Sequence, residues 1–492
     1  MIEHIHNKED AQEETFLKED NTKQDQLEFN ANLNKSSYRQ IFKATSLFGG
    51  VQFIQILIGI VKTKFVAILL GAGGVGLIGL FNAPLNLIIS IAGLGLSFSA
   101  VREISEAHGK GNQNKLSEVI TTLSRWAWVA GACGLIITIV LSPTLSQLTF
   151  GNKDYTWSFV WLSLTLLIDI VSKAQVTVLQ GVRRLQDLAK ASVYGSFAGL
   201  LTAIPLFYFF GSKGIVPSFI ITSITALLLS LNYSRKVKVE PVEMSFKKTF
   251  HNGKAMVKLG LVITFTGVIG FFAAYILSAF IGRFGGTEQV GLYNAGWSII
   301  GQSTGLVFAA MSTDFFPRLS SVNQDNSKVT SMVNQQAEMV VLILAPILVL
   351  LIAFMPIVVR VLYTSDFFGV IAFASWMVIS VLFKGMVWPV GFIFPAKGDV
   401  KTFGFIEITA MLFNISTNIL GYYFFGLEGL GGSIVVNYIF GMLLTFLFAY
   451  KKYKFRYEIT ALKQFFISLI CVVTIFIIAR TVEGLWSYFY MA

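Results

Sequence analysis

Long apolar stretches alternate with short polar connections along most of this chain. About 20 apolar residues suffice to cross the hydrocarbon core of a bilayer as one helix. The pattern predicts thirteen such helices, and so an all-α polytopic membrane protein. The expected helices cover residues 44–70, 75–99, 121–142, 156–179, 188–210, 214–233, 256–282, 288–312, 337–359, 367–393, 402–425, 430–450 and 461–481.

Composition agrees with a membrane protein and gives little sign of other chemistry. The chain is 54% hydrophobic and 13% charged, whereas soluble proteins carry about 25% charged residues. Residues 1–37 are polar and acid-rich without a long apolar run, so we expect a disordered cytoplasmic tail rather than a signal peptide. Cys133 and Cys471 fall in apolar segments, which argues against a disulfide framework. His4 and His6 make only a weak metal motif, so no metal or cofactor is expected.

Basic residues in the connections predict the orientation. With the N-terminus in the cytoplasm, 26 Lys and Arg residues lie on the inner side and five on the outer side. This bias explains the net charge of +11 without a nucleic-acid partner. The basic stretch 234–255 reads as a linker between a lobe at 38–233 and a lobe at 256–450, followed by an extra helix and tail at 451–492. The five outer residues are Lys153, Lys213, Arg283, Arg360 and Arg480.

An internal repeat supports two parallel six-helix lobes around a central cavity. The segment Gly79–Ser90 resembles Gly291–Gln302 at an offset of 212 residues. Six helices separate the copies, so both halves have the same orientation, as in one known transporter plan. Each copy places polar residues on one helix face, either to hydrogen-bond between helices or to line a cavity. These residues are Asn82, Asn86 and Ser90 in the first copy, and Asn294, Ser298 and Gln302 in the second.

Six ionisable residues, Lys64 among them, lie well inside apolar helices, where an ionised side chain costs roughly 2.5–3.5 kcal/mol. Lys62 shares a face with polar residues and is expected to point inward, unless it extends to the outer surface. Lys173 and Lys384 correspond at an offset of 211 and are candidate cavity residues. Asp169 lies four residues before Lys173, so it is either a local counter-charge or an ion-coupling group. Glu407 is a second candidate for ion coupling, or a buried hydrogen-bonding group.

Three motifs resemble a known family. The segments "FVAILLGAGGVGLIGLFNA", "GGTEQVGLYNAGWSII" and "FFPRLS" resemble the polysaccharide-transport branch of the multidrug/oligosaccharidyl-lipid/polysaccharide exporter superfamily, and most closely Wzx-type O-antigen and lipid III translocases. The resemblance implies a non-enzymatic flippase of the bacterial inner membrane with a central, often cationic cavity. It would move an undecaprenyl-pyrophosphate-linked oligosaccharide outward by alternating access. Membrane lipids, a polysaccharide polymerase and a chain-length protein would be its partners.

These observations combine into one hypothesis with open alternatives. Lys62, Lys173 and Lys384 would bind the pyrophosphate, while the two polar faces and Asn414, on the helix face of Glu407, would bind sugar hydroxyls. No G-x-x-x-x-G-K-[ST] motif for ATP occurs. A drug or cation exporter of the same fold would favour acidic residues in the cavity. A membrane enzyme would need a larger outer loop than this chain offers, and buried ionisable residues in both halves argue against a scaffold.

Overall fold

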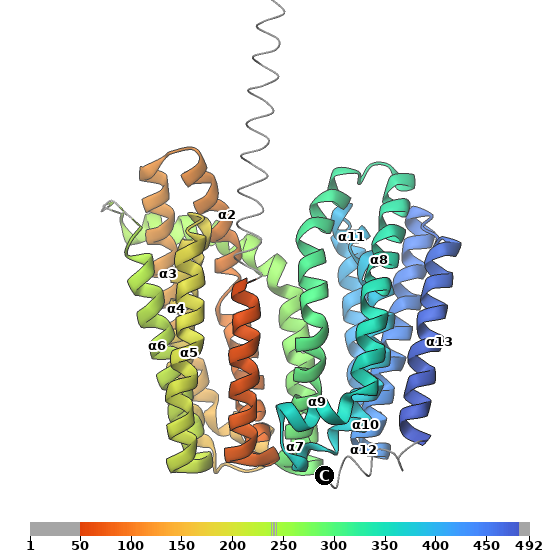
Figure 1. Ribbon diagram of the computed structural model, residues 1–492. Helices are drawn as coiled ribbons and strands as arrows, with labels where there is room; N and C mark the ends of the chain where they lie inside the picture. The colour runs from red at the N-terminus through yellow and green to blue at the C-terminus, as the bar shows by residue number, and fades with distance from the viewer. Residues whose placement is uncertain (1–49, 238, 240–241, 243, 482–492) are drawn as a thin grey trace, which may run out of the picture.

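Helices make up the chain wherever the structure describes it. The computed structural model describes residues 50–237, 239, 242 and 244–481, and these residues form helices joined by short turns, without a strand (Figure 1). The prediction of an all-α protein is confirmed. The acidic tail 1–37 and the first residues of the first expected helix lie outside the described residues.

Nine helical stretches of the described chain are long and apolar enough to cross a membrane. The first, Gly50–Ala92, is called the N-terminal stretch below. Hydrocarbon offers no hydrogen-bond partners, so a segment that crosses it must satisfy its own backbone groups, as a helix does. This explains why the described residues form helices and no strands. The remaining elements are α2 (Leu96–Gly109), α3 (Gln113–Phe150), α4 (Thr156–Gly181), α5 (Leu185–Phe210), η1 (Gly211–Gly214), α6 (Ile215–Ser234), α7 (Phe246–Ser321), α8 (Asn326–Ala353), α9 (Met355–Leu362), η2 (Ser365–Phe367), α10 (Val370–Gly391), α11 (Ile393–Ala396), α12 (Val400–Tyr453) and α13 (Ile459–Thr481).

Four of the nine stretches are interrupted by a glycine with positive φ. These glycines are Gly71, Gly211, Gly286 and Gly426, with φ between 53° and 77°, a region that glycine enters without steric penalty. The four stretches contain 43 to 54 residues, which as straight helices would be roughly 65 to 80 Å long against a hydrocarbon core of about 30 Å. Each therefore folds back into two segments. Nine stretches with four divided give thirteen segments among the described residues, the number that the hydropathy pattern predicts.

The turns recur at a constant spacing along the chain. Left-handed residues stand at Gly71 and Gly286, at Arg183 and Gly398, and at Gly211 and Gly426. Each pair is 215 residues apart, so the chain reverses direction at matching points in its two halves. The motif at Gly79 and Gly291 has an offset of 212 because its second copy follows its turn three residues sooner. Residues that correspond between the two halves are therefore 212 apart at this motif and 215 apart at the turns.

Figure 1 shows the helices in two groups. The N-terminal stretch and α2–α6 lie on one side, and α8–α13 lie on the other, with α7 between them. Within the first group α3, α4 and α6 pack together, and in the second α10 packs against α8 and α12. The extra helix α13 packs on α8 and α10. An even number of membrane segments separates each of the glycine turns at 71, 211, 286 and 426 from the next, so these turns lie on one face, called the glycine-turn face below.

The predicted linker 234–255 is partly helical. Helix α6 ends at Ser234 and α7 already begins at Phe246. Side chains of α3 hold this first turn: Arg125 Nη1 donates to the Met244 carbonyl at 2.9 Å and to Thr249 Oγ1 at 2.8 Å. Trp126 Nε1 donates to the Thr249 carbonyl at 3.2 Å. The linker is therefore shorter than the basic stretch, because tertiary hydrogen bonds extend the helix into it.

The two copies of the repeat touch each other through glycines. A Cβ atom added to Gly76 would lie 1.7 Å from the carbonyl oxygen of Thr287, and one added to Gly291 would lie 2.0 Å from that of Ala72. Small residues let membrane helices approach this closely. The halves are in backbone contact here, near the glycine-turn face.

Replacing Gly76 by alanine should destabilise the protein by about 1–3 kcal/mol, because the added methyl meets backbone rather than a side chain that can move. Thermal unfolding of the purified protein in detergent measures this as a lower melting temperature. Gly301→Ala is the matched control, since nothing lies within 4 Å of its added Cβ. Equal melting temperatures for the two variants would contradict the close crossing.

Candidate functional site

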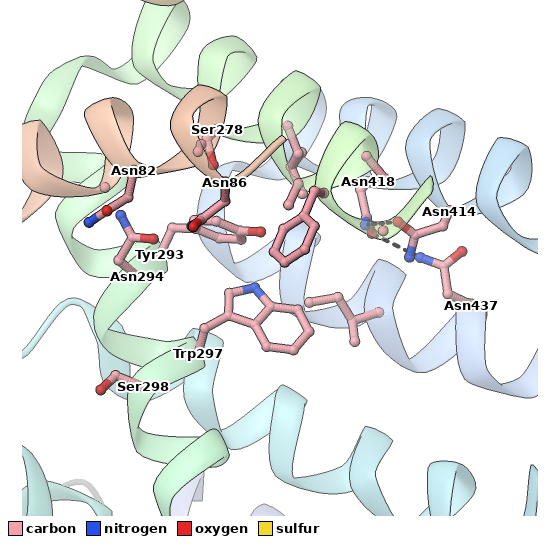
Figure 2. Close-up of a pocket in the computed structure, with 18 of the residues that line it drawn as sticks. Asn82, Asn86, Ser278, Tyr293, Asn294, Trp297, Ser298, Asn414, Asn418 and Asn437 are labelled. Atoms are coloured by element: carbon pink, nitrogen blue, oxygen red, sulfur yellow. Dashed lines mark hydrogen bonds between the residues drawn. The ribbon is translucent and has the colours of Figure 1, made fainter. Parts of the chain in front are cut away.

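A cavity of about 900 Å³ lies between the N-terminal stretch, α7, α10 and α12. Its size is within the range of about 300–1,000 Å³ that is usual for ligand sites. Figure 2 shows Asn82 and Asn294 near one end, the Asn414 group near the other, and Trp297 between them. The cavity therefore takes its walls from both halves of the chain.

Helical periodicity builds the first polar wall. Asn82 and Asn86 are four residues apart on the N-terminal stretch, and Asn294 and Ser298 have the same spacing on α7, so each pair faces one way. Asn294 packs directly over Gly79, where an added Cβ would lie 1.8 Å from its Nδ2. This Nδ2 is buried without a hydrogen-bond partner among the described residues. A buried donor of this kind costs about 1–3 kcal/mol, which a ligand oxygen would relieve.

The second polar wall is a hydrogen-bonded network on the two arms of α12. Asn418 Oδ1 accepts from Ser433 Oγ at 2.7 Å and from Asn437 Nδ2 at 2.9 Å. Its own Nδ2 donates to Asn414 Oδ1 at 3.1 Å, and Thr417 Oγ1 donates to Asn437 Oδ1 at 2.8 Å. These bonds connect the arms on either side of the Gly426 turn. They hold the amides of Asn414, Asn418 and Asn437 at the cavity wall (Figure 2).

Aromatic rings complete the lining. Tyr293 and Trp297 form an edge-to-face pair with ring centroids 6.4 Å apart, and Tyr363 also lines the cavity. Such rings offer a rigid apolar surface with a polar edge. Sequence analysis missed them, together with Ser278 and Asn437. Aromatic residues are 14% of the chain, so their presence singled out no position, and Asn437 joins the site only because α12 folds back at Gly426.

Of the ionisable residues predicted to be functional, one lysine and one glutamate line the cavity. Lys62 lines it from the N-terminal stretch and Glu407 from α12. No ion pair between described residues includes either group. Both charges are therefore available to a ligand or an ion. Seven of the twelve predicted site residues line this cavity: Lys62, Asn82, Asn86, Asn294, Ser298, Glu407 and Asn414.

Ser90, Gln302 and Lys384 do not line the cavity, contrary to expectation. Gln302 Nε2 donates to Ser298 Oγ at 2.7 Å, a bond within α7 and not between helices. Lys384 Nζ lies 4.4 Å from the ring centroid of Phe308 on α7. The aromatic face offers this ammonium a partner inside the protein. The third residue of each polar face lies beyond the end of the cavity.

Asp169 and Lys173 also lie outside the cavity. Lys173 is exposed on the surface of α4, while the Asp169 carboxylate lies beside the Ser223 hydroxyl of α6. The suggested Asp169–Lys173 ion pair is not among those formed by the described residues.

The offset of 215 between the turns pairs different residues of α4 and α10 than the offset of 211 does. Asp169 precedes the left-handed Arg183 by fourteen residues, and Lys384 precedes the left-handed Gly398 by fourteen. At the turn offset of 215 Asp169 corresponds to Lys384, whereas at the offset of 211 Lys173 does, so the pairing of Lys173 with Lys384 stays a prediction. The two registers differ by four residues, close to one helical turn, so the apolar pattern fits both.

Within the described residues, the apolar segments, the recurring turns and the polar cavity between two halves are the architecture of a multi-pass membrane transporter. The chain belongs to the polysaccharide biosynthesis protein family, whose model matches residues 65–372. This match, together with the curated relatives described next, confirms the resemblance that the sequence motifs indicate.

Two curated relatives are flippases. The chain is 22% identical over 339 residues to the probable low-salt glycan biosynthesis flippase Agl15 of Haloferax volcanii, covering 68% of this chain and 66% of that protein, just under two thirds of its length. It is 19% identical over 376 residues to the lipid III flippase of Escherichia coli, covering 75% of this chain and 88% of that one.

Solved structures share the fold. The lipid II flippase MurJ in an inward closed conformation matches with a TM-score of 0.65 and 14% identity, over 89% of this chain and 98% of that one. An inward-facing MATE family multidrug transporter matches with a TM-score of 0.62 and 16% identity, over 81% and 94%. At this identity the likeness establishes the architecture alone.

Asn418→Ala should lower the free energy of unfolding by about 1–3 kcal/mol, because Ser433 and Asn437 lose their common acceptor inside the protein. Thermal unfolding in detergent is the measurement. Asn86→Ala is the matched control, since Asn86 lines the same cavity but is exposed. If both variants melted at the parent temperature, the hydrogen-bonded network would not contribute to the stability of the fold.

Proposed function

We propose that this protein flips a lipid-linked oligosaccharide between the leaflets of a membrane. The observation that carries the proposal is the composition of the cavity wall, where amides, hydroxyls and aromatic rings accompany one lysine. The chain also belongs to a family of polysaccharide biosynthesis proteins. Amides match sugar hydroxyls as donors and acceptors, and a lysine ammonium is a common phosphate ligand. The relatives that are named as flippases support the same activity.

The ligand would divide between two environments. Asn82, Asn86, Asn294, Ser298 and Asn414 would bind the sugars, with Lys62 near the pyrophosphate. The polyprenyl chain would stay in the bilayer between the two helix groups, because apolar chains gain nothing by entering a polar cavity. We infer that these groups, close to the predicted lobes 38–233 and 256–450, rock against each other and expose the cavity to one leaflet at a time.

The direction proposed is outward, across the inner membrane of a bacterium. The basic residues on the face opposite the glycine turns favour a cytoplasmic location for that face and for the N-terminus. Each negative charge moved outward gains roughly 2.3 kcal/mol per 100 mV of inside-negative potential. An undecaprenyl pyrophosphate carrier and an O-antigen type of oligosaccharide are the substrate proposed, with a polymerase and a chain-length protein acting on the product.

Lys62→Met should reduce flipping roughly tenfold or more, because a hydrogen bond to a charged group contributes about 1.5–3 kcal/mol. Proteoliposomes that contain a fluorescent pyrophosphate-linked oligosaccharide report the rate. Lys62→Arg keeps the charge and should retain most of the activity.

Lys173→Met is the control for removal of a cation elsewhere, because Lys173 is exposed outside the cavity. Parent-level flipping by Lys62→Met, or an equal loss in Lys173→Met, would remove Lys62 from the site.

Glu407 tests ion coupling and the alternative function. We expect Glu407→Gln to flip substrate but to lose any acceleration by an imposed proton or sodium gradient, because the amide cannot exchange a proton or neutralise a cation. Flipping rates with and without the gradient measure this.

A drug or cation exporter is the second candidate, favoured by the carboxylate of Glu407 in the cavity. Efflux of a cationic dye that depends on Glu407, with no oligosaccharide flipping by the parent protein, would establish the exporter instead.

A further inference from the structure

Lys64 connects the two halves at the glycine-turn face. It lies on the N-terminal stretch, two residues after Lys62 and on the opposite side of the helix. Its ammonium donates to the carbonyl oxygen of Arg360 at 2.7 Å and to that of Tyr363. These two carbonyls belong to the last turn and the C-cap of α9. A cation of the first half thus caps a helix of the second half.

Arg283 makes the reciprocal connection. It lies on α7, three residues before the Gly286 turn, and its Nε donates to the carbonyl oxygen of Leu148 at 3.1 Å. Its Nη2 donates to the carbonyl oxygen of Gln147. Both carbonyls lie in the last turn of α3, which ends at Phe150. A cation of the second half thus caps a helix of the first half.

The two connections occupy similar places. The acceptors Leu148 and Tyr363 are 215 residues apart, the same spacing that relates the glycine turns. The donors do not keep this spacing, because Lys64 lies seven residues before Gly71 and Arg283 lies three residues before Gly286. In each case the donor stands shortly before the first turn of its own half, and the acceptor ends a later helix of the other half.

The chemistry explains why carbonyls suffice as partners. The end of a helix leaves carbonyls without intrahelical donors and carries about half a negative charge. No ion pair between described residues includes Lys64 or Arg283. Separating the halves would leave both the cation and the carbonyls without these partners. Each contact therefore favours the closed arrangement of this face.

Both contacts are connected to the cavity. Tyr363 accepts from Lys64 through its backbone, while its ring lines the cavity and its phenol lies against the Ser298 hydroxyl. On the other side, α7 carries Ser278 on the cavity wall and Tyr275, whose hydroxyl lies 3.1 Å from Thr149 Oγ1 of α3. A ligand that moves Ser298 or α7 therefore acts on residues next to the contacts.

We propose that Lys64 and Arg283 are a matched pair of latches that hold the glycine-turn face closed, and that this face opens when both release the helix ends of the opposite half. They are positioning residues for the change of access and do not bind substrate. The proposal rests on the transporter class and not on the identity of the substrate.

Spin-label distances across the glycine-turn face test the latches. Both native cysteines are replaced by serine, and labels are attached through Lys153→Cys and Asp366→Cys, two exposed positions on opposite halves. In nanodiscs without substrate, the parent should show mainly one short distance. Lys64→Met and Arg283→Met should each raise the long-distance population about two- to fivefold relative to the short one, since each removes a cation from an exposed or partly buried helix end. The double variant should raise it further.

Two controls make the result specific. Lys213→Met removes a cation from η1 on the same face and should leave the distances unchanged, while Lys64→Arg keeps the donor and should stay closed. Unchanged distances in both single variants, with parent-like melting, would overturn the proposal. So would equal opening by Lys64→Arg and Lys64→Met, because packing rather than donation would then be the cause. A latch variant that opens in a chain unable to flip oligosaccharide would refute the proposed function alone.

Discussion

Hydrocarbon does not hydrogen-bond, and this constraint shapes every level of the protein. It requires backbone groups to be satisfied within helices, so the described chain consists of helices joined by short turns. Each helix then ends in carbonyls without intrahelical donors. In this structure α3 and α9 end against Arg283 and Lys64 of the opposite half. A chain built from helices thus offers helix ends that cations of the other half can bind.

The close approach of the two repeat-bearing helices and the polar cavity between them depend on one another. Gly76 and Gly291 let the repeat copies cross near the glycine-turn face. From that crossing the same helices diverge and present Asn82, Asn86, Asn294 and Ser298 to a common space. A bulkier crossing would separate the walls of the cavity. The repeat is therefore a packing motif at one end and a binding surface at the other.

Sequence periodicity predicts the helices and the side of a helix that a residue occupies. It does not predict which residues of the two halves correspond or how far along a helix the cavity extends. The helix count and the inward side of Lys62 followed from composition and from 3.6-residue spacing. Lys384 was expected in the cavity but lies against Phe308, since a pattern along one helix does not show which neighbour it meets. The apolar pattern relates Lys384 to Lys173 and the turns relate it to Asp169, because a shift of about one helical turn preserves the face.

The sequence alone determined the membrane class, the thirteen segments, the repeat and seven of the polar positions of the cavity. These are local properties, since apolar length and helical spacing act within one segment. Only the tertiary structure decided which residues meet: Asn437 joins Asn418 across the Gly426 turn, and Tyr363 connects Lys64 to the cavity. Such contacts depend on how segments far apart in the chain pack together, and no spacing within a segment encodes that.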